Sequence, residues 1–175
     1  NIKNDSLVVD VGSNVGVLLD GFKRQGMKVI GVDASSNIVK KANKNGIETI
    51  LGFFNNDITK KIIDNSGRAS VVTATNLFAH IQNYHQFIID LKQLLEPNGI
   101  FVFQVPHFLK LVQNIEYDTI YHEHIAYFSL KPLIKFFESN EMELFDVLKT
   151  DIDGGSIRCF VANKGHFKKS SNIDK

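Results

Sequence analysis

The residues best suited to move protons stand together in one short stretch, Tyr121-His122-Glu123-His124. An imidazole exchanges a proton near neutral pH, and a carboxylate or phenol can orient it or hydrogen-bond to a reacting oxygen. Two other interpretations stay open at this point. The four residues could be an ordinary polar loop, or His122 and His124 could share one side of a strand, as in a metal site. We expect no metal, because a site needs three or four ligands and no spacing recruits the other histidines.

A second group of residues follows the first apolar run, at Asp10-Val11-Gly12-Ser13-Asn14-Val15-Gly16. Glycines at a strand-to-helix turn let the backbone approach a ligand, and the helix start offers N–H donors to an anionic group. A dinucleotide-binding site requires the motif G-x-G-x-x-G, and this loop lacks that spacing of glycines. The different spacing indicates a smaller ligand with a single carboxylate rather than a ligand with a pyrophosphate. An ordinary glycine turn is the alternative interpretation.

Asp33 ends the second apolar run, at the distance of ~20 residues from the loop where an acid commonly binds ribose hydroxyls. A helix-start acid that interacts with the helix dipole is the simpler alternative. Loop and acid together predict an adenosine-containing ligand, and they do not distinguish NAD from S-adenosylmethionine.

Short apolar runs that alternate with amphipathic segments position these residues. Such alternation predicts right-handed βαβ units. We therefore expect an α/β fold, a Rossmann-like and mostly parallel sheet with helices on both faces. The expected parallel strands are Leu7–Val11, Lys28–Val32, Ile47–Leu51, Ser70–Ala74 and Ile100–Val105. Leu144–Leu148 and Ile157–Val161 are expected to form an antiparallel pair at the carboxyl end, because Asp153-Gly154-Gly155 is a short connection between them.

The clearest helical period runs from Tyr84 to Leu95 and is expected to end at the turn Pro97-Asn98-Gly99. Hydrophobic periodicity is absent from Pro106 to Phe128. This is the stretch that holds the Tyr-His-Glu-His residues, and functional residues concentrate in such loops. Ser129 is a candidate N-cap for a further helix that contains Phe137.

Composition limits the functional classes. The chain has 175 residues, 43% hydrophobic and 22% charged, which predicts a folded domain. We expect a domain over residues 1–165 and a loose polar tail over 166–175. A net charge of +1 gives no bulk attraction to nucleic acid or an anionic membrane. No apolar run approaches the ~18 residues of a membrane span, and no signal peptide is recognised at the amino end. Cys159 is the single cysteine, and a cytoplasmic location is expected.

The loop, Asp33 and the strand–helix alternation together resemble class I S-adenosylmethionine-dependent methyltransferases. Nearly the whole chain, from Leu7 to about Asn163, resembles more specifically the sugar C-methyltransferases of bacterial deoxysugar biosynthesis. The stretches that carry this likeness are Gly46–Thr49 up to Phe53-Phe54, Ala74–His80, Glu116–His124, Tyr127–Leu130 and Gly154–Arg158. Val15 departs from the family's pattern, which often has aspartate there.

The resemblance implies a reaction and roles for residues. These enzymes methylate carbon 3 of nucleotide-linked 4-keto-hexoses, and a base must first remove a proton beside the ketone. His124 is the expected base, and Glu123 could orient a histidine or accept from a sugar hydroxyl. Tyr121 and His80 are expected to donate to the keto oxygen or to position the substrate.

The resemblance also implies a cofactor, S-adenosyl-L-methionine. Phe53 or Phe54 could flank its adenine, or both could be core residues. Asn76 follows the fourth strand and could contact the cofactor, and Gln104 and His107 are weaker candidates for the substrate. The expected cofactor residues are Asp10, Gly12, Ser13, Asn14, Gly16, Asp33, Ala34, Phe53 and Asn76.

Relatives of this type usually carry a cysteine-held zinc domain before this region and another domain after it. This implies that flanking domains of the same polypeptide are missing from the chain. The alternatives are an O- or N-methyltransferase for another small metabolite, or a non-catalytic adenosine-binding module. A nicotinamide-dependent oxidoreductase would need G-x-G-x-x-G and Tyr-x-x-x-Lys, and the sequence has neither.

Overall fold

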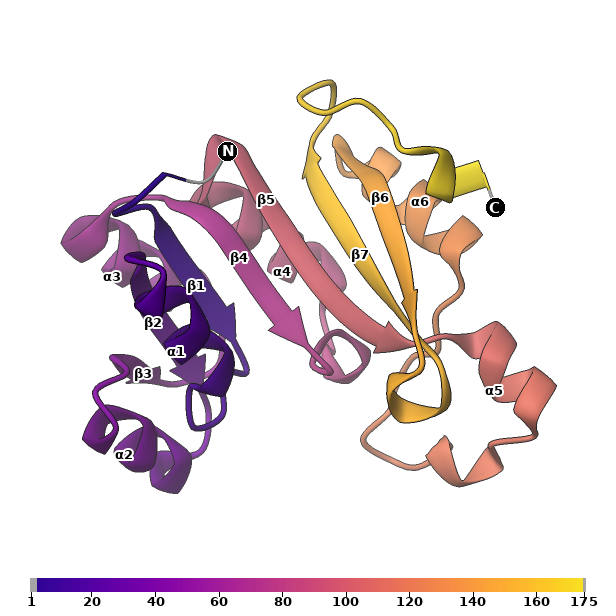
Figure 1. Ribbon diagram of the computed structural model, residues 1–175, viewed down its shortest axis with the longest axis horizontal. Coiled ribbons are helices and arrows are strands. Elements are labelled where there is room, and N and C mark those ends of the chain that lie inside the picture. Colours follow the sequence, from indigo (N-terminus) through magenta and orange to yellow (C-terminus); the bar gives the residue numbers. More distant parts are fainter. Residues whose placement is uncertain (1–2, 175) are drawn as a thin grey trace. The chain divides into compact units, whose positions relative to one another are not determined.

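The computed structural model describes residues 3–174 and contains one seven-stranded sheet in the order β3-β2-β1-β4-β5-β7-β6 (Figure 1). The pairs β1–β2, β1–β4 and β2–β3 are parallel, and β6–β7 is antiparallel, which confirms the predicted fold class. The strands are β1 (Leu7–Val11), β2 (Lys28–Asp33), β3 (Thr49–Leu51), β4 (Ala69–Thr75), β5 (Leu95–Pro106), β6 (Met142–Thr150) and β7 (Ser156–Asn163).

Two compact units divide the chain, and β4 and β5 contribute residues to both. The first unit consists of Asn1–Ala74 and Asn83–Ile100, and the second of Thr75–Gln82 and Phe101–Lys175. The first unit therefore holds the glycine loop and Asp33, and the second holds the Tyr-His-Glu-His stretch.

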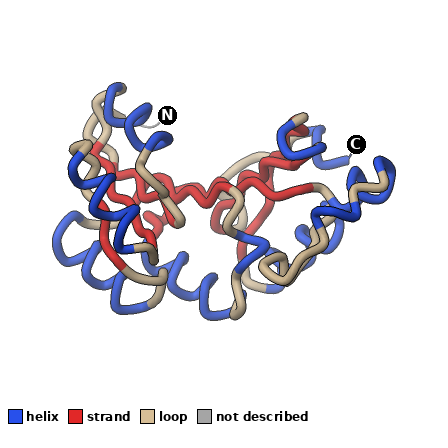
Figure 2. Tube along the Cα trace, turned by 90° about the horizontal axis from the view of Figure 1, so that it is seen from below, coloured by secondary structure: helices blue, strands red, loops and turns tan. Residues whose placement is uncertain are grey.

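Helices cover both faces of the strands in the first unit (Figure 2). Right-handed crossovers place α1 and α2 on one face and α3 and α4, which pack together, on the other. Every residue of β1 is buried, as expected for a parallel strand between two helical layers. The helices are α1 (Val17–Arg24), α2 (Ser36–Lys44), α3 (Asn56–Ser66) and α4 (Tyr84–Leu94).

The boundary between α4 and β5 differs from the prediction. The helix ends at Leu94, Leu95 already has extended backbone angles, and Pro97-Asn98-Gly99 lie within β5. Proline disfavours a helical conformation in the residue before it, so the chain leaves the helix before Pro97. A Cβ on Gly99 would lie 2.9 Å from the Ala69 carbonyl oxygen, so glycine allows β5 to lie close against β4. The third strand is also shorter than predicted and begins at Thr49.

An aromatic core holds the second unit together. Phe78 is fully buried in η1 (Phe78–His80), and its ring centroid lies 4.5 Å from that of Phe103 and 5.4 Å from that of Phe128. Further rings lie around it at 6.1–6.4 Å, those of Phe101, Phe136 and Phe137. The other elements are η2 (Tyr117–Thr119), α6 (Leu130–Ser139), η3 (Ile152–Gly154) and η4 (Ser171–Asp174).

One helix of the second unit was not predicted. α5 (Phe108–Asn114) lies in the stretch that lacks hydrophobic periodicity. Its apolar residues Phe108, Leu109 and Val112 are 45–56% exposed, and Leu111 alone is buried. The helix therefore has no continuous buried face, and so it leaves no period of 3.6 in the sequence.

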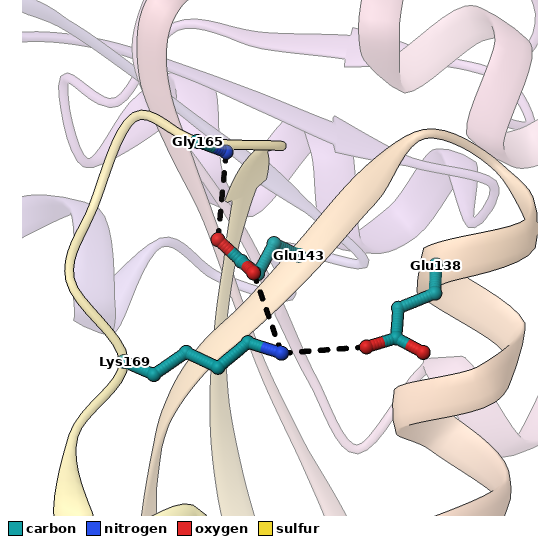
Figure 3. A network of polar contacts seen from close by, with 4 residues as sticks. All are labelled: Glu138, Glu143, Gly165 and Lys169. Carbon is teal, nitrogen blue, oxygen red and sulfur yellow. Dashed lines mark hydrogen bonds and ion pairs between the residues drawn. The ribbon is translucent and has the colours of Figure 1, made fainter.

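The carboxyl-terminal segment lies against β6 rather than forming the expected loose tail. The Phe167 ring stacks on Phe145 at 4.6 Å, and the Ser170 amide donates to the Phe145 carbonyl oxygen. The Lys169 ammonium lies 3.3 Å from both the Glu138 and the Glu143 carboxylates, and Figure 3 shows these contacts. The stacked ring and the backbone hydrogen bond fix this segment, because exposed ion pairs add only about 0–1 kcal/mol. Within residues 3–174, no helix is both long and apolar enough to cross a membrane.

We predict that Phe78→Ala lowers the free energy of unfolding by about 3–5 kcal/mol, because it leaves a cavity among packed rings. Phe53→Ala is the matched control, since Phe53 is 79% exposed. The control should change stability by no more than about 0.5 kcal/mol. Denaturant unfolding followed by circular dichroism measures both, and equal losses in the two variants would contradict this description of the core.

Candidate functional site

The glycine loop of the first unit forms a tight turn between β1 and α1. Gly12, Asn14 and Gly16 all have positive φ angles, 75°, 50° and 85°. Gly12 and Ser13 donate their amides to the Val32 carbonyl oxygen at 2.8 and 3.2 Å, which ties the loop to β2. Gly16 is the N-cap of α1, and no side chain caps this helix start. The first amides of α1 can therefore donate to an anionic group.

Asp33 holds the loop to the end of β2. One carboxylate oxygen accepts from the Asn14 amide at 3.0 Å, and the other accepts from the Ser35 amide at 2.9 Å. Each carboxylate oxygen can accept a second hydrogen bond, so Asp33 can still bind a pair of hydroxyls. Ala34 follows and is exposed, and it separates Asp33 from the start of α2.

Ser13 supplies a buried polar atom without a partner. The residue is 4% exposed, and its hydroxyl makes no hydrogen bond within residues 3–174. A side chain at Gly31 would collide with this hydroxyl and would lie 2.7 Å from Thr49 Oγ1. Glycine at position 31 therefore allows the Ser13 and Thr49 hydroxyls to lie close against the backbone of β2. A buried hydroxyl without a partner costs free energy, and a ligand atom there would remove that cost.

Asp10 is buried beneath the loop, with 4% of its surface exposed. One of its oxygens accepts a 2.6 Å hydrogen bond from the Thr73 hydroxyl of β4. Burial raises the pKa of Asp10 to about 6, and the negative charge of Asp33 adds to this rise while the Thr73 hydrogen bond opposes it. An ionised Asp10 is therefore costly unless a positive group approaches it.

The two aromatic residues after β3 have different surroundings. Phe54 packs on Phe87 of α4, with 5.2 Å between the ring centroids. Phe53 is 79% exposed. Phe54 is thus half-buried against α4, and the Phe53 ring is accessible to a ligand.

His124 is the centre of the polar cluster in the second unit. Its Nδ1 lies 2.9 Å from the Thr119 carbonyl oxygen, and its Nε2 lies 3.1 Å from the Tyr121 hydroxyl. A carbonyl oxygen only accepts hydrogen bonds, so Nδ1 carries the proton of the neutral ring. The lone pair is then on Nε2, and the Tyr121 hydroxyl donates to it. This arrangement makes Nε2 the basic atom of the ring.

His80 and Tyr127 complete the surroundings of His124. The ring centroids of His80 and His124 are 5.0 Å apart, and Tyr127 approaches His124 edge-on at 6.1 Å. The Ile125 amide donates to the Ala79 carbonyl oxygen at 3.1 Å, which joins the loop to η1. The structure therefore brings together three of the four predicted catalytic residues, His80, Tyr121 and His124.

Glu123 lies apart from this group. Its side chain is 61% exposed, and its carboxylate lies 3.9 Å from Nε2 of His122, which is 88% exposed. The Thr119 carbonyl, and not Glu123, holds Nδ1 of His124. No group of three or more potential metal ligands occurs in the described part of the chain.

Asn76 belongs to the second unit, whereas the other predicted cofactor residues belong to the first. Its side-chain amide donates to the Asp153 carboxylate at 2.9 Å, and both residues have positive φ angles. Strained backbone of this kind is frequent at functional sites. In the sequence, Asp153 is recognisable only as part of a turn, and an acid before two glycines is the signal that marks its position.

Two surface depressions, of about 490 and 370 Å³, lie in the first unit. The larger is lined by polar residues of α3 and α4 such as Asn55 and Gln86, and the smaller by residues around β3 and α3. Neither is lined by the glycine loop, so neither is the candidate site.

We predict that Asp10→Asn stabilises the fold more at pH 7.5 than at pH 4. The pKa of Asp10 rises from 3.8 to about 6 on folding, so the folded state binds more protons in this window and stability falls as pH rises through it. Asparagine avoids this loss, which is on the order of 2–3 kcal/mol. Urea unfolding at the two pH values measures the difference, with the exposed Asp57→Asn as control. A pH-independent difference would contradict the assigned pKa.

Comparisons with known proteins identify the family of the chain. Residues 1–146 match the family described as methyltransferase domain. The chain is 39% identical over 161 residues to the C-methyltransferase NovU of Streptomyces niveus, which covers 92% of this chain and 38% of NovU. It is 30% identical over 107 residues to a ubiquinone biosynthesis O-methyltransferase of Pasteurella multocida, over 55% of this chain and 44% of that protein. The chain thus spans less than half the length of these relatives.

Solved structures show the same fold. The plantazolicin methyltransferase BpumL, solved with a triazolic desmethylPZN analog and SAH, has a TM-score of 0.70 at 12% identity, over 91% of this chain and 77% of that one. Magnesium protoporphyrin IX methyltransferase of Synechocystis, with bound SAH, has a TM-score of 0.68 at 16% identity, over 91% and 74%. Family match, fold and glycine loop agree, and the chain belongs to the class I S-adenosylmethionine-dependent methyltransferases.

Proposed function

We propose that the protein transfers a methyl group from S-adenosylmethionine to a carbon beside the ketone of a nucleotide-linked 4-keto sugar. The observation that carries the proposal is the state of His124, whose Nε2 is left as a base by the hydrogen bond from Nδ1 to Thr119. The relative NovU, a C-methyltransferase by name, supports transfer to carbon. The resemblance of the Tyr-His-Glu-His stretch to sugar C-methyltransferases supports the substrate class.

The residues of the first unit fit the cofactor. The uncapped start of α1 suits its carboxylate, and the buried Asp10 carboxylate suits its ammonium group. Asp33 suits the ribose hydroxyls, and the exposed Phe53 ring suits an adenine face. The unpartnered Ser13 hydroxyl provides a further contact. The proposed cofactor surface is also formed by Gly12, Asn14, Gly16 and Ala34.

S-adenosylmethionine, when bound, supplies a methyl group that is electrophilic because it is attached to a positively charged sulfur. A sugar carbon is not a nucleophile until it loses a proton. His124 Nε2 accepts that proton, the C–H electron pair forms a carbon–carbon double bond, and the carbonyl electrons move to oxygen as an enolate. The enolate carbon would then bond to the methyl group that the cofactor supplies, the methyl–sulfur bond would break with its electron pair left on sulfur, and the ketone would be restored.

Tyr121 and His80 are placed to donate hydrogen bonds to the keto oxygen, on which negative charge develops during the reaction. The Tyr121 hydroxyl donates to Nε2 of His124 in this structure, and it becomes available to the keto oxygen when the substrate proton takes its place. The His80 ring, 5.0 Å from His124, is a second possible donor. Glu123, which is exposed and does not contact His124, is assigned to a sugar hydroxyl.

The O-methyltransferase relatives support a second candidate, transfer to a hydroxyl oxygen. The same His124 Nε2 would then remove a proton from oxygen rather than carbon. The two functions differ in one measurable respect, because only the first makes a carbon-bound hydrogen exchange with solvent. We also propose that segments outside this chain help to enclose the substrate, since the relatives are more than twice as long as their matched region.

Asp33→Asn should weaken the binding of S-adenosylhomocysteine about 10- to 100-fold, because a hydrogen bond to a charged group contributes roughly 1.5–3 kcal/mol. Titration calorimetry measures the affinity. Asp64→Asn, an exposed acid on α3, is the control and should bind like the parent. Thermal unfolding without ligand is recorded for both, because Asp33 also accepts two backbone amides. Parent-like affinity in Asp33→Asn would place the ribose elsewhere.

His124→Asn should abolish deuterium exchange at the carbon beside the ketone of a nucleotide-linked 4-keto-6-deoxyhexose, while S-adenosylhomocysteine affinity stays unchanged. Asparagine keeps a side chain that can hydrogen-bond but cannot act as a base at neutral pH. NMR in deuterated buffer with the full-length protein gives the exchange rate. His122→Asn is the matched control, two residues away and exposed. Exchange at the parent rate in His124→Asn would refute the assignment of the base.

A further inference from the structure

Arg158 of β7 is a half-buried cation with a neutral partner. Its Nε and Nη2 both donate to the side-chain oxygen of Gln104, at 3.2 and 2.8 Å. Gln104 is 2% exposed, so this pair is fixed inside the second unit. No carboxylate among residues 3–174 forms an ion pair with Arg158. The guanidinium charge is therefore held in place without being neutralised.

A guanidinium group has five N–H donors, and Gln104 uses two of them. Three donors remain, two on Nη1 and one on Nη2. A partly buried charge is costly unless an opposite charge compensates it. The planar fork of arginine fits the paired oxygens of a phosphate or the oxygen of an enolate. An anionic oxygen is thus the ligand that this group lacks.

The pair lies where β4 and β5 end. Gln104 is two residues before the end of β5, and its carbonyl oxygen accepts from the amide of Asn76, which directly follows β4. The His107 amide donates to the Gly155 carbonyl oxygen, so β7 begins at the edge where β5 ends. Ligands of α/β sheets bind outside this edge. All of these residues belong to the second unit.

An acidic residue, Asp153, lies at the same edge and bonds to Asn76. Asp153 accepts from the Asn76 side chain at 2.9 Å and does not bond to Arg158. The Asp153 carboxylate thus accepts from a neutral amide, that of Asn76. The Arg158 guanidinium donates to a neutral amide oxygen, that of Gln104. This arrangement differs from an internal ion pair, in which the two charges would cancel.

We propose that Arg158, positioned by Gln104, binds an anionic oxygen of the substrate. The inference rests on the proposed function and adds a specificity residue to it. The oxygen belongs either to the diphosphate of the nucleotide or to the enolate that forms at the ketone. Both sources share the chemistry of an oxyanion in a guanidinium fork, and the two arms of the experiment separate them.

The test compares Arg158→Met and Gln104→Glu with Arg24→Met in the full-length protein. Methionine removes the charge and keeps much of the side-chain volume. Gln104→Glu keeps Arg158 and places a carboxylate against it, so the new carboxylate neutralises the guanidinium charge inside the protein. Arg24 is an exposed arginine of α1 and serves as the matched control. Arg158 could instead serve only to hold β5 against β7. In that case Gln104→Glu would strengthen the contact, because an ion pair replaces a neutral hydrogen bond, and activity would be unchanged.

The first arm measures binding of UDP and dTDP by titration calorimetry, with S-adenosylhomocysteine as the reference ligand. The second arm measures deuterium exchange beside the ketone of dTDP-4-keto-6-deoxyglucose. Contact with the diphosphate predicts about 10- to 100-fold weaker nucleotide binding in Arg158→Met and Gln104→Glu. Contact with the enolate predicts unchanged nucleotide binding and an exchange rate lowered by a similar factor. Arg24→Met and the affinity for S-adenosylhomocysteine should not change.

The inference is overturned if the parent protein binds nucleotide and exchanges deuterium while both variants equal the parent. It is also overturned if Arg158→Met loses activity and Gln104→Glu keeps it, because the arginine would then act as a brace. A parent protein that neither binds nucleotide nor exchanges deuterium contradicts the proposed function itself, and the inference falls with it. Thermal unfolding of each variant shows whether the fold is retained.

Discussion

The hydrogen bond from His124 Nδ1 to the Thr119 carbonyl oxygen is the interaction on which the proposed chemistry depends. A carbonyl oxygen cannot donate, so the bond fixes the neutral tautomer and leaves the lone pair on Nε2. Many enzymes orient a catalytic histidine with a carboxylate, and here a backbone carbonyl takes that place. The Tyr121 hydroxyl meets the lone pair at 3.1 Å, which keeps the ring in position without adding a charge.

The chain assigns its two tasks to separate groups of residues. In the first unit, Asp33 accepts the amides of Asn14 and Ser35 and so fixes the loop that is proposed to hold the cofactor. In the second unit, backbone bonds from Ile125 to Ala79 and from Asn76 to Gln104 fix the residues proposed for the substrate. β4 and β5 run through both units.

The sequence predicted those features that depend on neighbouring residues. The run Leu7–Val11, apolar except for Asp10, was sufficient to predict a buried parallel strand, and the glycines after it to predict a tight turn. Features that depend on distant residues or on exposure were not predicted. α5 shows no period because its apolar side chains are exposed, and α4 ends early because Pro97 acts on the residue before it. The docking of the tail on Phe145 depends on a ring contact that composition does not indicate.

Prediction of the candidate site from the sequence is limited in the same way, because some of its contacts join distant residues. His80, Tyr121 and His124 were found from residue type and from a family likeness, but the group that orients His124 is a backbone carbonyl, which no side-chain motif reveals. Arg158 and Gln104 are 54 positions apart, and their pairing became visible only in the folded chain. Glu123 shows the converse, because a carboxylate adjacent in sequence to His124 does not contact its ring.

The most direct test of this account is the tautomer of His124, read from the nitrogen shifts and long-range proton couplings of a histidine-labelled sample above pH 7.5. His124→Asn assigns the signal by its absence. We predict a protonated Nδ1 and an unprotonated Nε2 in the protein without substrate. A proton on Nε2 with a lone pair on Nδ1 would mean that Thr119 does not hold the ring, and the base proposed for the reaction would be lost.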